Sequence, residues 1–129
     1  MIVLDASAAV ELVLATPPGA AVARRLRHEV LHVPAHFDVE VIGAIRRAVL
    51  RQLISDHEGL VAVADFRALP VRPWPTKTFV GRAYELRNTH AIADGVYIAL
   101  SEGLSAPLVT CDGRLARSHG HDAEIELVA

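Results

Sequence analysis

Short apolar runs alternate along the chain with longer segments in which apolar residues recur every three or four positions. Short runs are typical of buried strands, and the longer periodicity is typical of helices that pack one face on a core. The pattern predicts strands over residues 2–4, 30–33, 69–72, 107–110 and 124–128. It predicts helices over residues 7–14, 19–29, 36–53, 55–67, 76–87 and 92–102, and a short helix from 112 or 113 to about 120.

Prolines and capping residues mark where these elements begin and end. Pro17 and Pro18 predict a break between the first two helices. Ser55, followed three residues later by Glu58, predicts a capping box, and Gly103 predicts the end of the helix before it. Because strands and helices take turns with no hairpin signal, we expect an α/β three-layer sandwich. Its parallel sheet of about five strands would lie between two layers of helices.

Composition limits the class of protein. The 129 residues predict one domain over residues 1–129, and 52% of them are hydrophobic, which is enough for a buried core. The formal net charge of −2 gives no overall positive field, so nucleic-acid binding needs a local basic patch. The chain lacks the basic start of a signal peptide, and its longest uncharged stretch, 12–23, is shorter than the about 20 residues that span a bilayer. We therefore expect a cytoplasmic protein with no membrane partner.

Acidic residues follow two of the predicted strands. Asp5 follows the first strand and Asp112 follows the fourth. Because parallel strands end at one edge of a sheet, where ligands bind, the two carboxylates are expected to face one pocket. Each is also a good N-cap for the helix that follows it. Asp94 shares a helix face with Ile98, which favours a functional carboxylate over a first-turn acid, whereas periodicity alone does not distinguish Glu40 from a solvated glutamate.

The four acids together resemble the acidic blocks of the PIN domain. They stand in the segments "VLDASAAVELVL", "VEVIGAIRR", "IADGVYIALSEG" and "LVTCDGRLAR", which carry Asp5, Glu40, Asp94 and Asp112. Chain length and block spacing look most like the VapC-type toxins of bacterial toxin–antitoxin pairs. The resemblance covers nearly the whole chain and supports Glu40 as the fourth acid. Two positions depart from it, because Gly43 stands where family members usually carry Asn, and Gly95 where they carry a residue like Ala.

Four carboxylates in one pocket predict a metal site. Two charges 4 Å apart repel by on the order of 4 kcal/mol at an effective dielectric near 20, so the cluster needs protons or a divalent cation. Oxygen-only ligands favour Mg²⁺ or Mn²⁺ over zinc. We expect Asp5 and Asp112 to bind the ion directly, with Glu40 and Asp94 binding a second ion or ordering waters. The metal would activate a water for attack on a phosphodiester, which makes all four acids candidate catalytic residues.

Hydroxyl and basic side chains lie close to these acids in the sequence. Ser7 and Thr110 stand two residues from Asp5 and Asp112, and the PIN resemblance suggests that they orient the ligands or a water. As alternatives, Ser7 is a helix cap and Thr110 an ordinary strand residue. The candidate RNA phosphate contacts, which could equally be solvated helix faces, are Arg46, Arg47, Arg51, Arg114 and Arg117.

The resemblance implies the toxin component of a type II toxin–antitoxin pair. It implies a Mg²⁺-dependent endoribonuclease that cuts a structured RNA such as a tRNA or rRNA. It also implies a homodimer and a cognate VapB-type antitoxin, whose basic C-terminal segment lies in a groove and reaches the acidic pocket. The apolar helices at 8–14 and 20–26 are candidates for this groove, although ordinary core packing uses the same residues.

Several alternatives remain open at this point. Gly43 is compatible with a catalytically silent PIN-like module that only binds RNA or a protein. A phosphoacceptor receiver domain needs a lysine at a late strand end, whereas Lys77 lies inside a predicted helix. His119 and His121 are interpreted as surface-loop residues, and Cys111, the single cysteine, as a core thiol.

Overall fold

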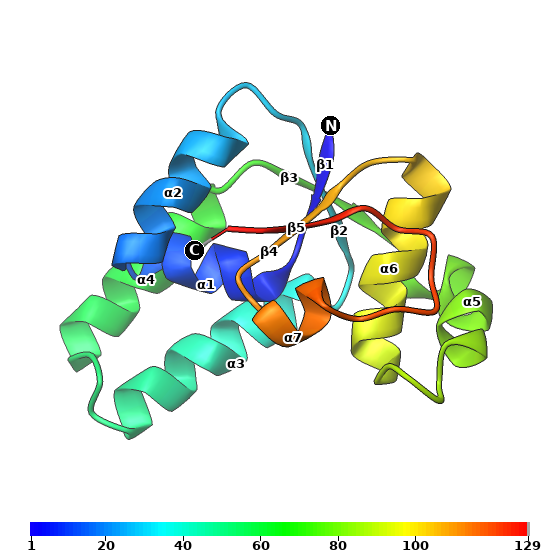
Figure 1. Ribbon diagram of the computed structural model, residues 1–129. Coiled ribbons are helices and arrows are strands. Elements are labelled where there is room, and N and C mark those ends of the chain that lie inside the picture. The colour runs from blue at the N-terminus through cyan, green and yellow to red at the C-terminus, as the bar shows by residue number, and fades with distance from the viewer. Residues whose placement is uncertain (129) are drawn as a thin grey trace.

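The computed structural model describes residues 1–128, which contain a five-stranded sheet flanked by helices (Figure 1). The strands are β1 (Ile2–Leu4), β2 (Leu31–Pro34), β3 (Val71–Trp74), β4 (Leu108–Thr110) and β5 (Ile125–Leu127). They lie in the order β3-β2-β1-β4-β5, and every neighbouring pair is parallel. The predicted α/β architecture with a parallel sheet is confirmed.

Helices cover the sheet on both sides. In Figure 1, α1 to α4 gather on one side of the sheet, while α5 and α6 lie on the other, which gives the predicted three layers. Within residues 1–128 the α-helices are α1 (Ala6–Val13), α2 (Pro17–Leu26), α3 (Phe37–Leu50), α4 (Asp56–Ala68), α5 (Val80–Glu85), α6 (Ile92–Leu104) and α7 (Gly113–Ala116), with a 3₁₀ turn, η1 (Thr76–Thr78).

The core lies around the central strand and the helix that crosses it. All three residues of β1 are fully buried, as is expected for a parallel strand covered on both faces. Helix α6 buries every residue from Gly95 to Ser101, including Tyr97, the largest fully buried side chain. Because β1 and α6 are fixed in this core, the acids at the end of β1 and in the first turn of α6 have well-defined positions.

Several predicted boundaries are wrong for identifiable reasons. The predicted break between the first two helices is confirmed, but Pro17 and Pro18 begin α2 instead of preceding it. Proline fits there because the first turn has no backbone partner for an N–H group. The Thr16 hydroxyl caps this helix by accepting a hydrogen bond from the Gly19 N–H (3.2 Å). Strand β3 runs to Trp74 and includes Pro73, which is tolerated because β3 is an edge strand.

Three helix predictions also change in detail. The segment predicted as one helix over 76–87 is divided into η1 and α5, and α7 ends at Ala116 instead of near residue 120. Helix α6 continues past Gly103 to Leu104 and ends at Ser105, whose φ of 50° is left-handed. The capping box of α4 is confirmed, because Ser55 and Glu58 exchange hydrogen bonds of 2.9 and 3.1 Å.

Each helix within residues 1–128 is shorter than the about 20 residues that cross a bilayer. Within residues 1–128, none of them alone is both long and apolar enough to cross one. The pair α1 and α2 reaches that length and composition only when both are taken together, across a bend of 113°.

Candidate active site

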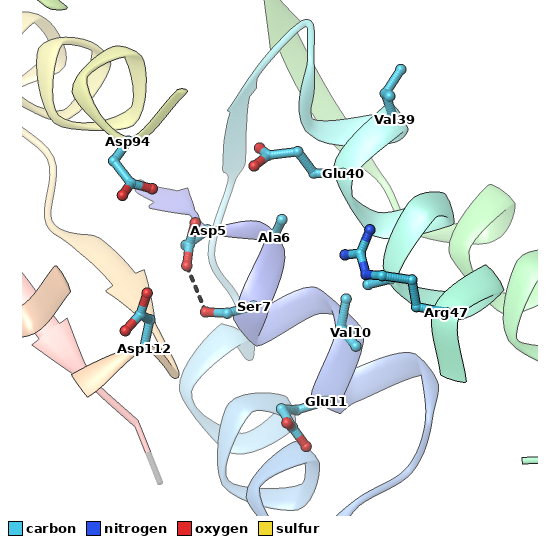
Figure 2. Close-up of a pocket in the computed structure, with 11 residues that line it drawn as sticks. Asp5, Ala6, Ser7, Val10, Glu11, Val39, Glu40, Arg47, Asp94 and Asp112 are labelled. Carbon is cyan, nitrogen blue, oxygen red and sulfur yellow. Dashed lines mark hydrogen bonds between the residues drawn. The ribbon is translucent and has the colours of Figure 1, made fainter. Parts of the chain in front are cut away.

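All four predicted acids line one pocket beyond the carboxyl ends of β1 and β4 (Figure 2). Asp5 directly follows β1, and Asp112 follows β4, its neighbour in the sheet. Glu40 comes from the first turn of α3 and Asp94 from the first turn of α6. The topological rule for parallel sheets therefore located the pocket, and α3 and α6 bring one further carboxylate each.

The Asp5 carboxylate is the buried centre of the pocket. Only 6% of the residue is exposed. Its Oδ2 accepts hydrogen bonds from the hydroxyls of Ser7 (2.5 Å) and Thr110 (2.7 Å). Burial raises the pKa of Asp5 above its usual range, the two hydroxyls lower it, and the charges of Asp94 and Glu40 raise it again. The net rise means that the negative charge on Asp5 is stabilised incompletely by the protein alone.

The two hydroxyls also join the ends of β1 and β4. Ser7 Oγ lies 3.1 Å from Thr110 Oγ1 and accepts a hydrogen bond from the Cys111 N–H (3.0 Å). Thr110 Oγ1 accepts one from the Asp112 N–H (3.0 Å). Ser7 and Thr110 thus contact Asp5 and fix its orientation, as the resemblance suggested. Asp5 stands at the N-cap position of α1, but its side chain is directed to these hydroxyls, so the interpretation of Asp5 as a simple helix cap is wrong.

We expect Thr110→Val to destabilise the protein by about 1–3 kcal/mol, because it leaves Asp5 Oδ2 and the Asp112 N–H each short of a buried partner. It also removes a donor that lowers the pKa of Asp5, so that pKa rises further. The destabilisation should be larger at a pH above the raised pKa of Asp5 than at a pH below the ordinary pKa of aspartate. Denaturant unfolding at both pH values measures this, with Thr110→Ser as the matched control that keeps the hydroxyl. Equal losses at both pH values would contradict the assignment to Asp5.

Arg114 bridges the other two walls of the pocket. Its Nη2 lies 3.1 Å from Asp94 Oδ2 and 3.2 Å from Asp112 Oδ2. Asp112 is at the same time the N-cap of α7, since its Oδ1 accepts hydrogen bonds from the backbone N–H groups of Arg114 (2.9 Å) and Leu115 (3.3 Å). Both interpretations of Asp112, cap and pocket acid, therefore hold. Arg114, which was predicted as a phosphate contact, forms ion pairs with two acids of its own chain.

Glu40 lies beside a buried group of polar atoms. His36 Nε2 is 3.2 Å from Glu40 Oε1 but lacks the alignment of a hydrogen bond, and the His36 ring meets Tyr97 edge-on. Glu40 Oε1, His36 Nε2 and the Tyr97 hydroxyl are buried without a hydrogen-bond partner among residues 1–128. Burial raises the pKa of Glu40, but the neighbouring His36 and Tyr97 lower it more, so the net pKa is below its ordinary value. Glu40 is thus ionised at neutral pH, with its Oε1 buried beside His36.

The pocket contains one acid that sequence reasoning missed. Glu11 lines it from α1, next to Val10. Its position was readable from the sequence, because it stands four residues after Ser7 and so on the same face of the helix. The Glu11 carboxylate accepts a hydrogen bond from the Thr16 hydroxyl at the start of α2.

The predicted basic residues are separated by the structure. Arg47 lines the acidic pocket, whereas Arg46, its neighbour on α3, lines an apolar groove between α3 and α4. The Arg117 guanidinium lies over Gly113, within 2.8 Å of where a Cβ atom would stand at that glycine. Only Arg47 and Arg114 of the predicted set are therefore at the pocket in the part of the chain that the structure describes.

The first two helices are mainly core elements. Ala8, Ala9, Val13 and Val22 are buried, which favours core packing over a groove for these residues. A group of exposed apolar side chains lies instead on and after α3 and on α4; its members are Val39, Ile42, Leu50, Leu53, Leu60 and Val61. Cys111 is half-buried, and burial raises the pKa of its thiol, in agreement with an unreactive thiol.

The donor set of the pocket fits a hard cation. Within residues 1–128 no three His, Cys, Asp or Glu side chains lie close enough together to bind one ion directly. Mg²⁺, however, is commonly held by one or two carboxylates and keeps several waters. The carboxylates around this pocket match that chemistry, whereas a zinc cage would need His or Cys ligands.

A solved structure shows the same fold. The crystal structure of Mycobacterium tuberculosis VapC20, described as a Sarcin-Ricin loop cleaving toxin, superposes with a TM-score of 0.67. The superposition covers 90% of this chain and 93% of that one at 15% sequence identity, so it establishes the architecture. This chain therefore has the same fold as VapC20.

Sequence comparisons place the chain more closely. Residues 2–119 match the PIN domain family. The chain is 76% identical to ribonuclease VapC12 of Mycobacterium tuberculosis over 129 residues, the full length of both. It is 34% identical to ribonuclease VapC3 of the same organism, over 91% of this chain and 86% of VapC3. The chain therefore belongs to the PIN domain family, among its VapC-type members.

Proposed function

We propose that this protein is the toxin of a type II toxin–antitoxin pair and acts as a Mg²⁺- or Mn²⁺-dependent endoribonuclease. The observation that carries the proposal is the pocket in which Glu40, Asp94 and Asp112 surround the buried, incompletely stabilised charge of Asp5. Such a pocket favours a divalent cation, and a cation in turn favours a phosphodiester. VapC12 and VapC3, its relatives, are both named ribonucleases.

In this proposal Asp5 and Asp112 hold the metal, with Glu40 and Asp94 on the facing walls. When bound, the metal lowers the pKa of a water and offsets charge on the phosphate. Ser7 and Thr110 keep the Asp5 carboxylate in one orientation through their hydrogen bonds to Oδ2. The Glu40 carboxylate, which lines the pocket and is ionised at neutral pH, would accept a hydrogen bond from the attacking water. The water would add to phosphorus as one P–O bond to the neighbouring sugar breaks, and the proton lost by the water would end on the departing sugar oxygen.

Removing the metal tests this function. Purified protein, freed of any antitoxin, should cleave RNA when Mg²⁺ or Mn²⁺ is added and stop when a chelator is present. A mixture of tRNA and rRNA is the substrate, because a structured RNA of either kind is proposed. Gel analysis of the fragments measures cleavage, and readdition of the metal should restore it. Cleavage that persists in chelator would contradict the metal mechanism, and no cleavage with either metal would favour the catalytically silent module.

The exposed apolar groove is the proposed docking site of a cognate VapB-type antitoxin. Arg46, Ile42 and Leu60 are among its lining residues, and the adjoining hollow beside Ile42 reaches Val39, which also lines the acidic pocket. An amphipathic helix that continues into a basic segment would match both surfaces. We further propose that the protein is a homodimer, which sedimentation analysis tests.

A further inference from the structure

We propose that Arg47 is a phosphate-binding residue of the acidic pocket, and that Gly43 provides the space it needs. This inference rests on the proposed function, since the phosphate is that of an RNA substrate. Figure 2 shows Arg47 extending from α3 toward the space between Glu40 and α1. It lines the same pocket as the four acids, on the wall formed by α3.

The guanidinium of Arg47 is not neutralised by an acidic side chain in the described part of the chain. It forms no ion pair with any carboxylate of residues 1–128, although the pocket contains five acids. Arg114, the other arginine at the pocket, is engaged by Asp94 and Asp112. An RNA backbone that approaches this pocket is repelled by the acids, so a fixed positive charge at its rim is needed on the substrate side. A guanidinium suits that task because its fork of N–H donors matches two phosphate oxygens.

Helix geometry explains why Arg47 reaches the pocket. Gly43 stands one turn before Arg47 on the same face of α3, and long helical side chains lean toward the helix N-terminus. The guanidinium therefore lies over Gly43, with Nη1 at 3.4 Å from the position that a Cβ atom would take there. A larger side chain at 43, such as the Asn expected from the PIN resemblance, would compete for this space. The departure at Gly43 thus makes room for a cation at the pocket and is not simply the loss of a polar group.

RNA binding at a series of salt concentrations tests the proposal. The probe is a short fluorescein-labelled single-stranded RNA of mixed sequence, bound to protein carrying Asp5→Asn so that it is not cut. Arg47→Ala should weaken binding by about tenfold and reduce the slope of log affinity against log salt by about 0.7, the value for one lost phosphate contact. Arg47→Lys should recover part of the affinity, because it keeps the charge without the fork. Gly43→Asn should reproduce part of the Arg47→Ala loss.

Arg46→Ala is the matched control, because Arg46 is on the same helix but lines the apolar groove. It should leave the slope unchanged. Equal effects of Arg46→Ala and Arg47→Ala would overturn the proposal in favour of a diffuse basic helix edge, and so would an unchanged slope in Arg47→Ala. The thermal transition of each variant checks that it folds. Because both arginines are exposed, replacing either one should leave the fold intact. If wild-type protein cleaves no RNA but the slope still shifts, the nuclease proposal fails and this one stands. If wild type cleaves RNA and the slope does not shift, this proposal alone fails.

Discussion

Asp5→Asn is expected to abolish RNA cleavage and at the same time to raise the free energy of unfolding of the metal-free protein. The carboxylate is buried, and the amide keeps its size and one oxygen that accepts the hydroxyl hydrogen bonds of Ser7 and Thr110. The charge that attracts the metal is lost. Mutating a residue that only hydrogen-bonds to a metal ligand reduces metal affinity or activity by about 10–100-fold. Loss of a proposed direct ligand should therefore reduce cleavage by at least about a hundredfold.

The stability gain has a definite pH dependence. The pKa of Asp5 is raised in the folded protein, chiefly by burial, so the folded state holds this proton more tightly than the unfolded state. The wild-type protein therefore loses stability as pH rises from the ordinary pKa of aspartate through the raised value, and the whole penalty is present above it. Asn at this position does not titrate. The stability difference between Asp5→Asn and wild type should thus be small at acidic pH, grow through that window and stay constant above it.

Nuclease assays with added Mg²⁺ and urea unfolding in chelator measure the two effects. Asp38→Asn is the control, because Asp38 is an exposed acid in the same first turn of α3 as Glu40 but lines a different hollow. It should change neither cleavage nor the pH dependence of stability. If the Asp5→Asn protein cleaves RNA normally, Asp5 is not part of the metal site. If it unfolds more easily than wild type at neutral pH, the charge of Asp5 does not destabilise the folded protein.

The acids at strand ends were predictable because their position follows from topology. Asp5 and Asp112 follow neighbouring parallel strands, and no detail of side-chain packing is needed to bring them to one edge. Glu40 is different, since it lies opposite the apolar stripe of its helix and only the family resemblance selected it. The direction of a side chain was harder to predict. Asp5 turns away from its helix toward Thr110, a contact across 105 positions that local capping preferences do not contain.

The basic residues show the same limit. Arg46 and Arg47 are adjacent in the sequence, yet one lines an apolar groove and the other the acidic pocket. Their roles depend on the helices that face each side of α3, which the periodicity of α3 alone does not show. The start of α2 was predicted two residues too late, at Gly19, because proline breaks a helix interior but suits a first turn. The sequence pattern shows proline but not its place relative to the Thr16 cap.

Gly19→Ala is expected to destabilise the protein by at least about 3 kcal/mol, the upper part of the usual range for overpacking. Gly19 is buried in the first turn of α2, where α2 lies against α1. A Cβ atom at 19 would overlap the carbonyl oxygen of Glu11 and come within 2.8 Å of its carbonyl carbon. That carbonyl is held in place, because it also accepts a hydrogen bond from the Thr16 N–H (3.2 Å). The clash can be relieved only by moving the two helices apart.

Gly81→Ala is the matched control, because Gly81 lies in α5 and a Cβ atom there meets no atom of residues 1–128 within 4 Å. Helix propensity alone favours alanine over glycine by about 1 kcal/mol, so Gly81→Ala should stabilise the protein slightly. The two substitutions share one chemical change and have opposite expected signs, which urea unfolding resolves. Two stabilised variants would contradict the close approach of α1 and α2. Because Glu11 lines the acidic pocket from α1, any Gly19→Ala protein that folds should also bind metal more weakly than Gly81→Ala does.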